Sequence, residues 1–207
     1  MKMYTHTGAK RVIDKCKDQD IGLLMVDQWR DPSKWNYYAI DNGAFSYFNR
    51  GIPWNPSPFL SLLYKAQECA IKPDFVVCPD IVAGGDDSLE FSKKWMAVLP
   101  KKFDYYLAVQ DGMNTLKVLN VLHSYKFSGI FVGGTTDWKL ETAEKWCQIA
   151  HKYNIGCHIG RIGPMNRIKW ADRIGADSID STTWVQRESS FDHIMSAKAQ
   201  TILEELQ

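Results

Sequence analysis

Carboxylate side chains recur in this sequence at the ends of short apolar runs. Asp27, Asp41, Asp80 and Asp180 each follow or close such a run. Two carboxylates roughly 5–9 Å apart can cleave a glycosidic bond, one attacking or shielding the anomeric carbon and the other moving a proton. A single Asp after a strand is as often a helix N-cap or turn residue. Taken together, the four predict a polar pocket suited to glycosidic chemistry.

Further groups at the ends of such runs suit a flat, hydrogen-bonding heterocycle. Asp80 can accept hydrogen bonds from ring N–H and amino groups, and Gln110 can both donate and accept. Backbone N–H groups at Gly133 and Gly134 can meet a carbonyl oxygen, and Phe45 and Tyr106 offer faces for stacking. This combination matches guanine, so a glycosidic bond to a guanine-like base is the expected substrate.

The pocket requires a fold that brings distant strand ends together. Eight apolar runs alternate with stretches of helical periodicity, which predicts parallel βαβ units. The predicted strands are 2–6, 21–26, 37–40, 74–78, 105–109, 129–133, 156–160 and 177–180. The predicted helices are 9–17, 57–70, 87–98, 114–123, 137–152, 164–174 and 191–206. Eight strands in one domain over 1–207 favour a compact (β/α)8 barrel, whose active site lies at the C-terminal ends of the strands. A doubly wound open sheet is the alternative.

Composition excludes several classes of protein. The 207 residues carry 25 basic and 24 acidic side chains, a net charge of +1, which argues against a uniformly basic nucleic-acid-binding surface. No apolar run approaches the ~20 residues of a membrane span, and the N-terminus does not resemble a secretory signal. Five cysteines at irregular spacings indicate free thiols in a cytoplasmic protein, with neither a disulfide framework nor a zinc site.

Several segments, in order along the chain, resemble the tRNA-guanine transglycosylase (queuine tRNA-ribosyltransferase) family. The segment HIGRIGPMNRIKWADRIGADSIDSTTW (158–184) is similar to the region that ends in the covalent nucleophile. This resemblance implies that Asp180 is the nucleophile, with Asp177 as the neighbouring alternative. AIDNGAFSY (39–47) resembles the loop that carries the general acid/base, which implies that role for Asp41 and base stacking for Phe45.

The remaining matches concern base recognition. CPDIV (78–82) resembles the segment that reads the guanine edge and implies that role for Asp80. LAVQDG (107–112) and FVGGTTD (131–137) are similar to strands that place Gln110, Gly133 and Gly134 on the base. Ile159 stands where the family has a Met on the far face of the base. Family members are (β/α)8 barrels, in agreement with the strand count.

The chain also departs from the family pattern, because it has no CxCxxC zinc subdomain and is much shorter. It is therefore more similar to the short members, found in phages and bacterial modification clusters, that exchange guanine in DNA for a 7-deazaguanine base. The resemblance implies a pentosyltransferase that needs no cofactor or metal, in the host cytoplasm if phage-encoded. Its partners would be DNA in preference to tRNA and a free 7-deazaguanine base, and it could form a homodimer or join a partner subunit.

Alternative activities remain open at this stage. They are the same exchange on tRNA, an N-glycosidase acting on a free nucleoside or nucleotide, a noncatalytic RNA-binding subunit, and an inactive barrel that kept the pocket outline. The presence of both Asp41 and Asp180 argues against the last two.

Nucleic-acid contacts are expected near the nucleophile. Arg161 and Arg187 are the preferred phosphate ligands, and Trp184 either stacks on a neighbouring base or closes the barrel. His158 is expected to have a core or supporting role, and His6 is a possible pocket residue.

Overall fold

Eight parallel strands close into a barrel in the computed structural model, which describes residues 1–6 and 10–186. The strands are β1 (Lys2–Thr5), β2 (Ile21–Met25), β3 (Tyr38–Ile40), β4 (Val76–Val77), β5 (Tyr105–Val109), β6 (Gly129–Val132), β7 (Gly156–Ile159) and β8 (Ser178–Asp180). Each strand pairs with the next, and β8 returns to β1, where Ile179 lies opposite Met3. The predicted (β/α)8 barrel is confirmed, and the open-sheet alternative is wrong.

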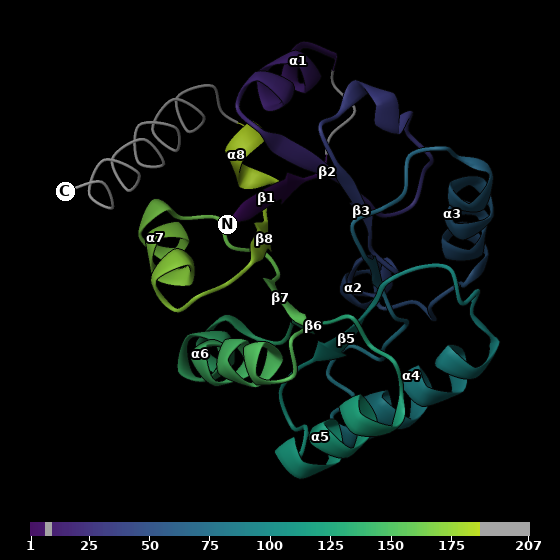
Figure 1. The fold of residues 1–207 in the computed structure, drawn as a ribbon, viewed down its shortest axis with the longest axis vertical. Coiled ribbons are helices and arrows are strands. Elements are labelled where there is room, and N and C mark those ends of the chain that lie inside the picture. The colour runs from purple at the N-terminus through teal and green to yellow at the C-terminus, as the bar shows by residue number, and fades with distance from the viewer. Residues whose placement is uncertain (7–9, 187–207) are drawn as a thin grey trace.

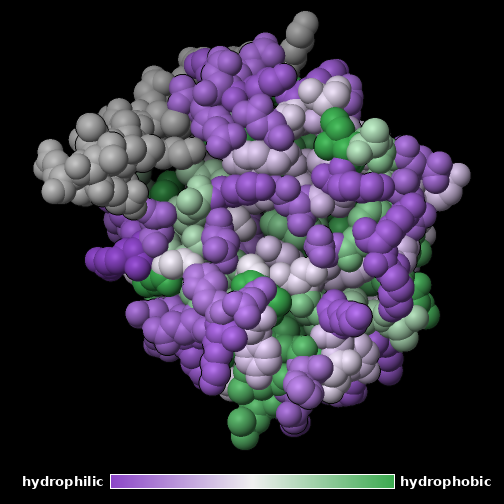
Figure 2. Space-filling view, viewed as in Figure 1, coloured by the Kyte–Doolittle hydropathy of each residue, from purple (hydrophilic) through white to green (hydrophobic). Residues whose placement is uncertain are grey.

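Helices surround the barrel and follow its strands in turn (Figure 1). They are α1 (Lys10–Asp18), α2 (Ala44–Asn49), α3 (Ser57–Glu68), α4 (Asp86–Val98), α5 (Thr115–Ser124), α6 (Thr136–Lys152), α7 (Met165–Arg173) and α8 (Thr183–Gln186), with a short 3-10 turn at Pro32–Lys34. Side-chain caps fix the starts of two of them. Asn114 accepts from the first amides of α5, and Thr135 accepts from the amide of Trp138 in α6. The side chains over the helices are mostly hydrophilic on the face shown in Figure 2, and paler residues lie toward its centre.

Two short helices were not predicted from the sequence. Helices α2 and α8 have six and four residues, too few for an apolar repeat of period 3.6 to be recognised. The closing helix predicted at 191–206 lies outside the described residues. Among the residues that are described, no helix is both long and apolar enough to cross a membrane.

The alternation of side chains along each strand divides the apolar residues into two cores. One set packs between the strands and the surrounding helices, and includes Ile130, Val132 and Ile159. The other fills the barrel itself and comprises Tyr4, Leu24, Ala39, Phe75, Val77 and Ala108, with Tyr37, Tyr106 and Phe131 packed against them. Side chains that point into the barrel recur every two residues along a strand. On each strand, the last of these side chains therefore lies at the open end of the barrel, where the strands have their C-terminal ends.

Aromatic rings close the opposite end of the barrel. Tyr106 stacks on Phe75 with ring centroids 4.3 Å apart, and burial raises the pKa of Tyr106 to about 12. Tyr106 therefore belongs to the barrel floor, and the prediction that it offers a stacking face in the pocket is wrong. Inward glycines make room for it, because a Cβ at Gly129 would lie 2.4 Å from its ring.

A Gly156→Ala substitution should test this packing. The added Cβ would lie 2.1 Å from the hydroxyl oxygen of Tyr106, so we expect a loss of about 1–3 kcal/mol in unfolding free energy. Urea denaturation measures it. A second Tyr106→Phe change removes the clashing hydroxyl and should restore part of the loss. If the effects of Gly156→Ala and Tyr106→Phe on the unfolding free energy simply add in the double variant, this explanation is contradicted.

Candidate active site

A cavity of about 520 Å³ opens at the C-terminal ends of the strands. This is within the 300–1,000 Å³ typical of small-molecule sites. It is lined by residues from the strand ends and the loops that follow them. Those predicted from the sequence are His6, Asp27, Asp41, Phe45, Asp80, Gln110, Gly133, Gly134, Arg161 and Asp180. The structure therefore brings most of the predicted site residues together in one cavity.

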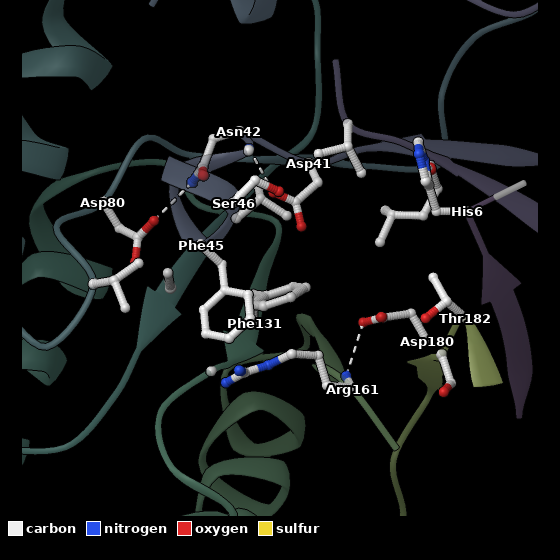
Figure 3. A pocket seen from close by; sticks show the side chains of 18 of the residues that line it. His6, Asp41, Asn42, Phe45, Ser46, Asp80, Phe131, Arg161, Asp180 and Thr182 are labelled. Atoms are coloured by element: carbon white, nitrogen blue, oxygen red, sulfur yellow. Dashed lines mark hydrogen bonds between the residues drawn. The ribbon is translucent and has the colours of Figure 1, made fainter. Parts of the chain in front are cut away.

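Asp41 and Asp180 extend into this cavity from opposite sides (Figure 3). Asp41 follows β3, and its Oδ1 accepts a hydrogen bond of 2.7 Å from the amide of Gly43. Burial raises the pKa of Asp41, and the negative charge of Asp180 raises it further, against the opposing effect of the Gly43 amide. A raised pKa favours the protonated form of a carboxyl group. Asp41 thus has the environment of a general acid that works beside a second carboxylate.

Asp180 is held at one oxygen. Its Oδ1 accepts from the imidazole Nε2 of His158 at 3.0 Å and from the backbone amide of Arg161 at 3.2 Å. Because a carboxylate can only accept, Nε2 of His158 is the donor in this bond, and Nδ1 lies within hydrogen-bond distance, 2.8 Å, of the Ser178 hydroxyl. His158 also stacks on Phe131, with centroids 4.8 Å apart. The imidazole is fully buried, and both hydrogen bonds are made to Oδ1 of a carboxylate that lines the cavity.

Asp80 lies in a separate part of the cavity, joined to the Asp41 loop by Asn42. The Asn42 amide donates 2.9 Å hydrogen bonds to Asp80 Oδ1 and to the Cys78 carbonyl. Burial raises the pKa of Asp80 to about 6, partly offset by the Asn42 hydrogen bond. Asn42 is buried and was not identified from the sequence as a site residue, although it lies in the segment AIDNGAFSY (39–47) next to Asp41. It couples the proposed acid/base loop to the carboxylate that would read the base.

Gln110 lines the cavity, but its side-chain amide is hydrogen-bonded to the loop after β4. Its Nε2 donates to the Ile81 carbonyl at 2.8 Å and to the Ser88 hydroxyl at 3.1 Å, and lies 3.3 Å from Asp80. Its Oε1 accepts from the Ala83 amide at 2.6 Å. In this structure Gln110 supports the Asp80 loop, and a base would have to compete with these bonds for its amide.

Arg161 crosses the cavity mouth. Its guanidinium lies 3.8 Å from the centroid of the Phe45 ring and donates to the Gly134 carbonyl at 2.5 Å. Its backbone has φ 60°, which is unusual for a residue with a side chain and is often found at functional positions. The charge of Arg161 faces the carboxylates of Asp180 and Asp41.

The two glycines after β6 border the cavity, as predicted. Gly134 has φ +74°, and a Cβ there would lie 2.4 Å from the Asp111 carboxylate. That carboxylate accepts from both the amide and the hydroxyl of Thr135. The close approach of the two loops therefore requires glycine at 134.

Two predicted contacts do not line the cavity. Ile159 is fully buried in the core between β7 and the helices, because its neighbours His158 and Gly160 take the inward positions. The predicted contact of Ile159 with the base is therefore wrong. Trp184 is 1% exposed and donates to the Gly163 carbonyl at 3.0 Å. It packs in the core between the strands and the helices and has no free face for a nucleic-acid base, so the alternative in which it stacks on a base is wrong. Arg187 lies outside the described residues.

Asp177 differs from Asp180 in position. It precedes β8 at the opposite end of the barrel and accepts from the Cys157 amide at 2.7 Å. Its carboxylate is half exposed and contacts His151. Of the two carboxylates, only Asp180 reaches the cavity.

Phe131 is a cavity residue that sequence reasoning missed. The signal was present, because Phe131 lies two residues before Gly133 and so shares its inward side of β6. No cluster of three or more potential metal ligands occurs in the part of the chain that is described.

Comparison with known proteins leaves the family resemblance as a hypothesis. No protein-family model matches the chain, and no curated protein has a significantly similar sequence. The functional argument therefore rests on the residues and geometry of the cavity itself.

Proposed function

We propose that this protein is a base-exchange transglycosylase that replaces guanine in DNA with a 7-deazaguanine derivative. The observation that carries the proposal is the pair of carboxylates extending into one cavity from opposite sides. One is Asp41, whose pKa is raised by burial, and the other is Asp180, held at Oδ1 by His158 and the Arg161 amide. This is the division between acid and nucleophile that a retaining displacement needs.

The proposed reaction has two displacement steps. Oδ2 of Asp180 attacks C1′ of the target nucleotide, the C1′–N9 bond breaks, and Asp41 gives its proton to the departing guanine. The product is a glycosyl ester of Asp180. The incoming 7-deazaguanine then transfers its N9 proton to Asp41, and N9 attacks C1′ and releases the Asp180 carboxylate. Asp41 thus regains the proton it gave. On a duplex, the target nucleotide must first leave the base stack.

Base recognition would centre on Asp80. Its carboxylate can accept from N1–H and the 2-amino group of guanine, while O6 lies toward the backbone at Gly133 and Gly134. Phe45 would stack on the base once Arg161 moves from its ring. Arg161 could then meet the phosphate backbone, as the sequence predicted.

Asp80 gives base binding a defined pH dependence. Only the carboxylate accepts two hydrogen bonds from the base, and its pKa is about 6. Guanine affinity should therefore weaken as pH falls through about 6, by up to tenfold per pH unit below it. Calorimetric titration between pH 5 and 8 measures this. In Asp80→Asn, binding should be weak and independent of pH over this range. A wild-type affinity that stays constant would contradict the role of Asp80.

DNA is preferred over tRNA because the chain resembles the short, zinc-less members of the transglycosylase family. The deciding experiment incubates the protein with radiolabelled guanine and, separately, with duplex DNA, single-stranded DNA and bulk tRNA. We expect label to enter DNA and the Asp180→Ala variant to be inactive. Label in tRNA alone would overturn the choice of polymer. Release of unlabelled guanine without incorporation would indicate a hydrolase, and no reaction with any polymer would contradict the proposal.

A further inference from the structure

A buried lysine contacts the loop that holds the proposed nucleophile. Lys139 lies on α6 and is 3% exposed, and its ammonium donates to the Gly160 carbonyl at 2.5 Å. Lysine is almost never fully buried unless it is paired with another group, because removing the ammonium from water is costly. The partner here is a neutral carbonyl. The fold thus keeps a costly charge at this point, where an apolar side chain would pack without that cost.

The partner carbonyl belongs to the peptide group that holds Asp180. In a planar trans peptide the C=O and the following N–H point in opposite directions. The Gly160 carbonyl points toward Lys139, and the Arg161 amide of the same peptide donates to Asp180 Oδ1 at 3.2 Å. The next amide, of Ile162, donates to the Asp180 carbonyl at 2.7 Å. One peptide group therefore links the Lys139 ammonium to the Asp180 carboxylate.

The charges around Lys139 make this link sensitive to protonation. Burial lowers the pKa of Lys139 to about 8, and the positive charges of Arg161 and Arg167 lower it further, whereas Asp180 and Asp111 oppose the shift. A cation on a carbonyl oxygen draws electron density from the amide nitrogen, so the N–H on the other side becomes a stronger donor.

We propose that Lys139 is a positioning residue for Asp180, and that it acts through the Gly160–Arg161 peptide. Its ammonium strengthens the Arg161 amide as a donor to Oδ1, which fixes the carboxylate so that Oδ2 alone is presented to C1′. The role of Asp180 as the nucleophile rests on the proposed function. The electrostatic link between Lys139 and the Arg161 amide does not.

The link can be tested without any enzymatic reaction. In ¹⁵N–¹H correlation spectra of the wild-type protein, the Arg161 amide proton should move upfield as Lys139 loses its charge, with a midpoint near pH 8. In Lys139→Met this titration should be absent. In Lys139→Gln, which keeps a donor without the charge, it should be absent as well. Lys145→Met removes an exposed lysine of the same helix, paired with Thr115, and should leave the titration intact.

Kinetics of base exchange then connect the link to catalysis. Lys139→Met should lower kcat by roughly 10- to 100-fold, the usual cost of losing a supporting contact, with little change in KM for guanine. A wild-type Arg161 amide that does not titrate near pH 8 would overturn the inference, whatever the activity. An amide that titrates in a protein without exchange activity would support the link and refute the proposed function. A loss of thermal stability in Lys139→Met, with the exchange rate of the folded protein unchanged, would reduce Lys139 to a structural role.

Discussion

Replacing Asp180 with asparagine should lower base exchange by roughly 10⁴-fold or more. An amide oxygen cannot form the glycosyl ester, yet it can still accept from His158 and the Arg161 amide, so the fold and the cavity should persist. The measurement is incorporation of labelled guanine under single-turnover conditions. The covalent intermediate offers a second readout, because wild-type protein mixed with a target oligonucleotide and denatured should carry the nucleotide chain as an adduct.

Asp177→Asn is the matched control for this prediction. Its carboxylate lies only three residues away in the sequence, but at the other end of the barrel, bonded to the Cys157 amide and to His151. The variant should react at close to the wild-type rate and form the adduct. Adduct formation by Asp180→Asn would show that another group attacks C1′. An inactive Asp177→Asn variant that remains folded would also contradict the assignment.

Replacing Asp41 with asparagine should lower the exchange rate by about 10²- to 10⁴-fold, the usual contribution of a general acid. Wild-type adduct formation should fall as pH rises through the raised pKa of Asp41, because the departing base needs the protonated acid. The variant should lose that part of the pH dependence, since the amide does not titrate. Rates of adduct formation between pH 5 and 9 measure both effects.

A substrate with a better leaving group separates this role from a structural one. A target nucleotide carrying 7-methylguanine already has a cationic base, so it needs no proton when C1′–N9 breaks. Asp41→Asn should therefore form the adduct with this substrate at a rate much closer to wild type. An equal loss with both substrates would indicate that Asp41 shapes the cavity and transfers no proton. Asp27→Asn, another carboxylate at the cavity edge, serves as control and should affect both substrates alike.

The sequence by itself determined the barrel and the convergence of its carboxylates. Most strands are short, largely buried apolar runs, and such runs separated by amphipathic helices predict parallel βαβ units. Once eight strands run parallel, their C-terminal ends meet at one rim, which is why Asp41, Asp80 and Asp180 line one cavity. The strict alternation of side chains also explains why the predicted contact of Ile159 with the base was wrong, since Ile159 faces the outer core.

Only the tertiary structure decided how those groups are supported. The hydrogen bonds of His158 to Asp180, of Asn42 to Asp80 and of Lys139 to Gly160 join residues 21 to 38 positions apart in the chain. The same is true of the burial of Trp184 against Gly163 and of the Gln110 amide turned to the Asp80 loop. Local patterns of apolar and polar residues set which side of a strand a residue occupies. They carry no information on which distant donor meets which acceptor, because this depends on the packing of the closed barrel.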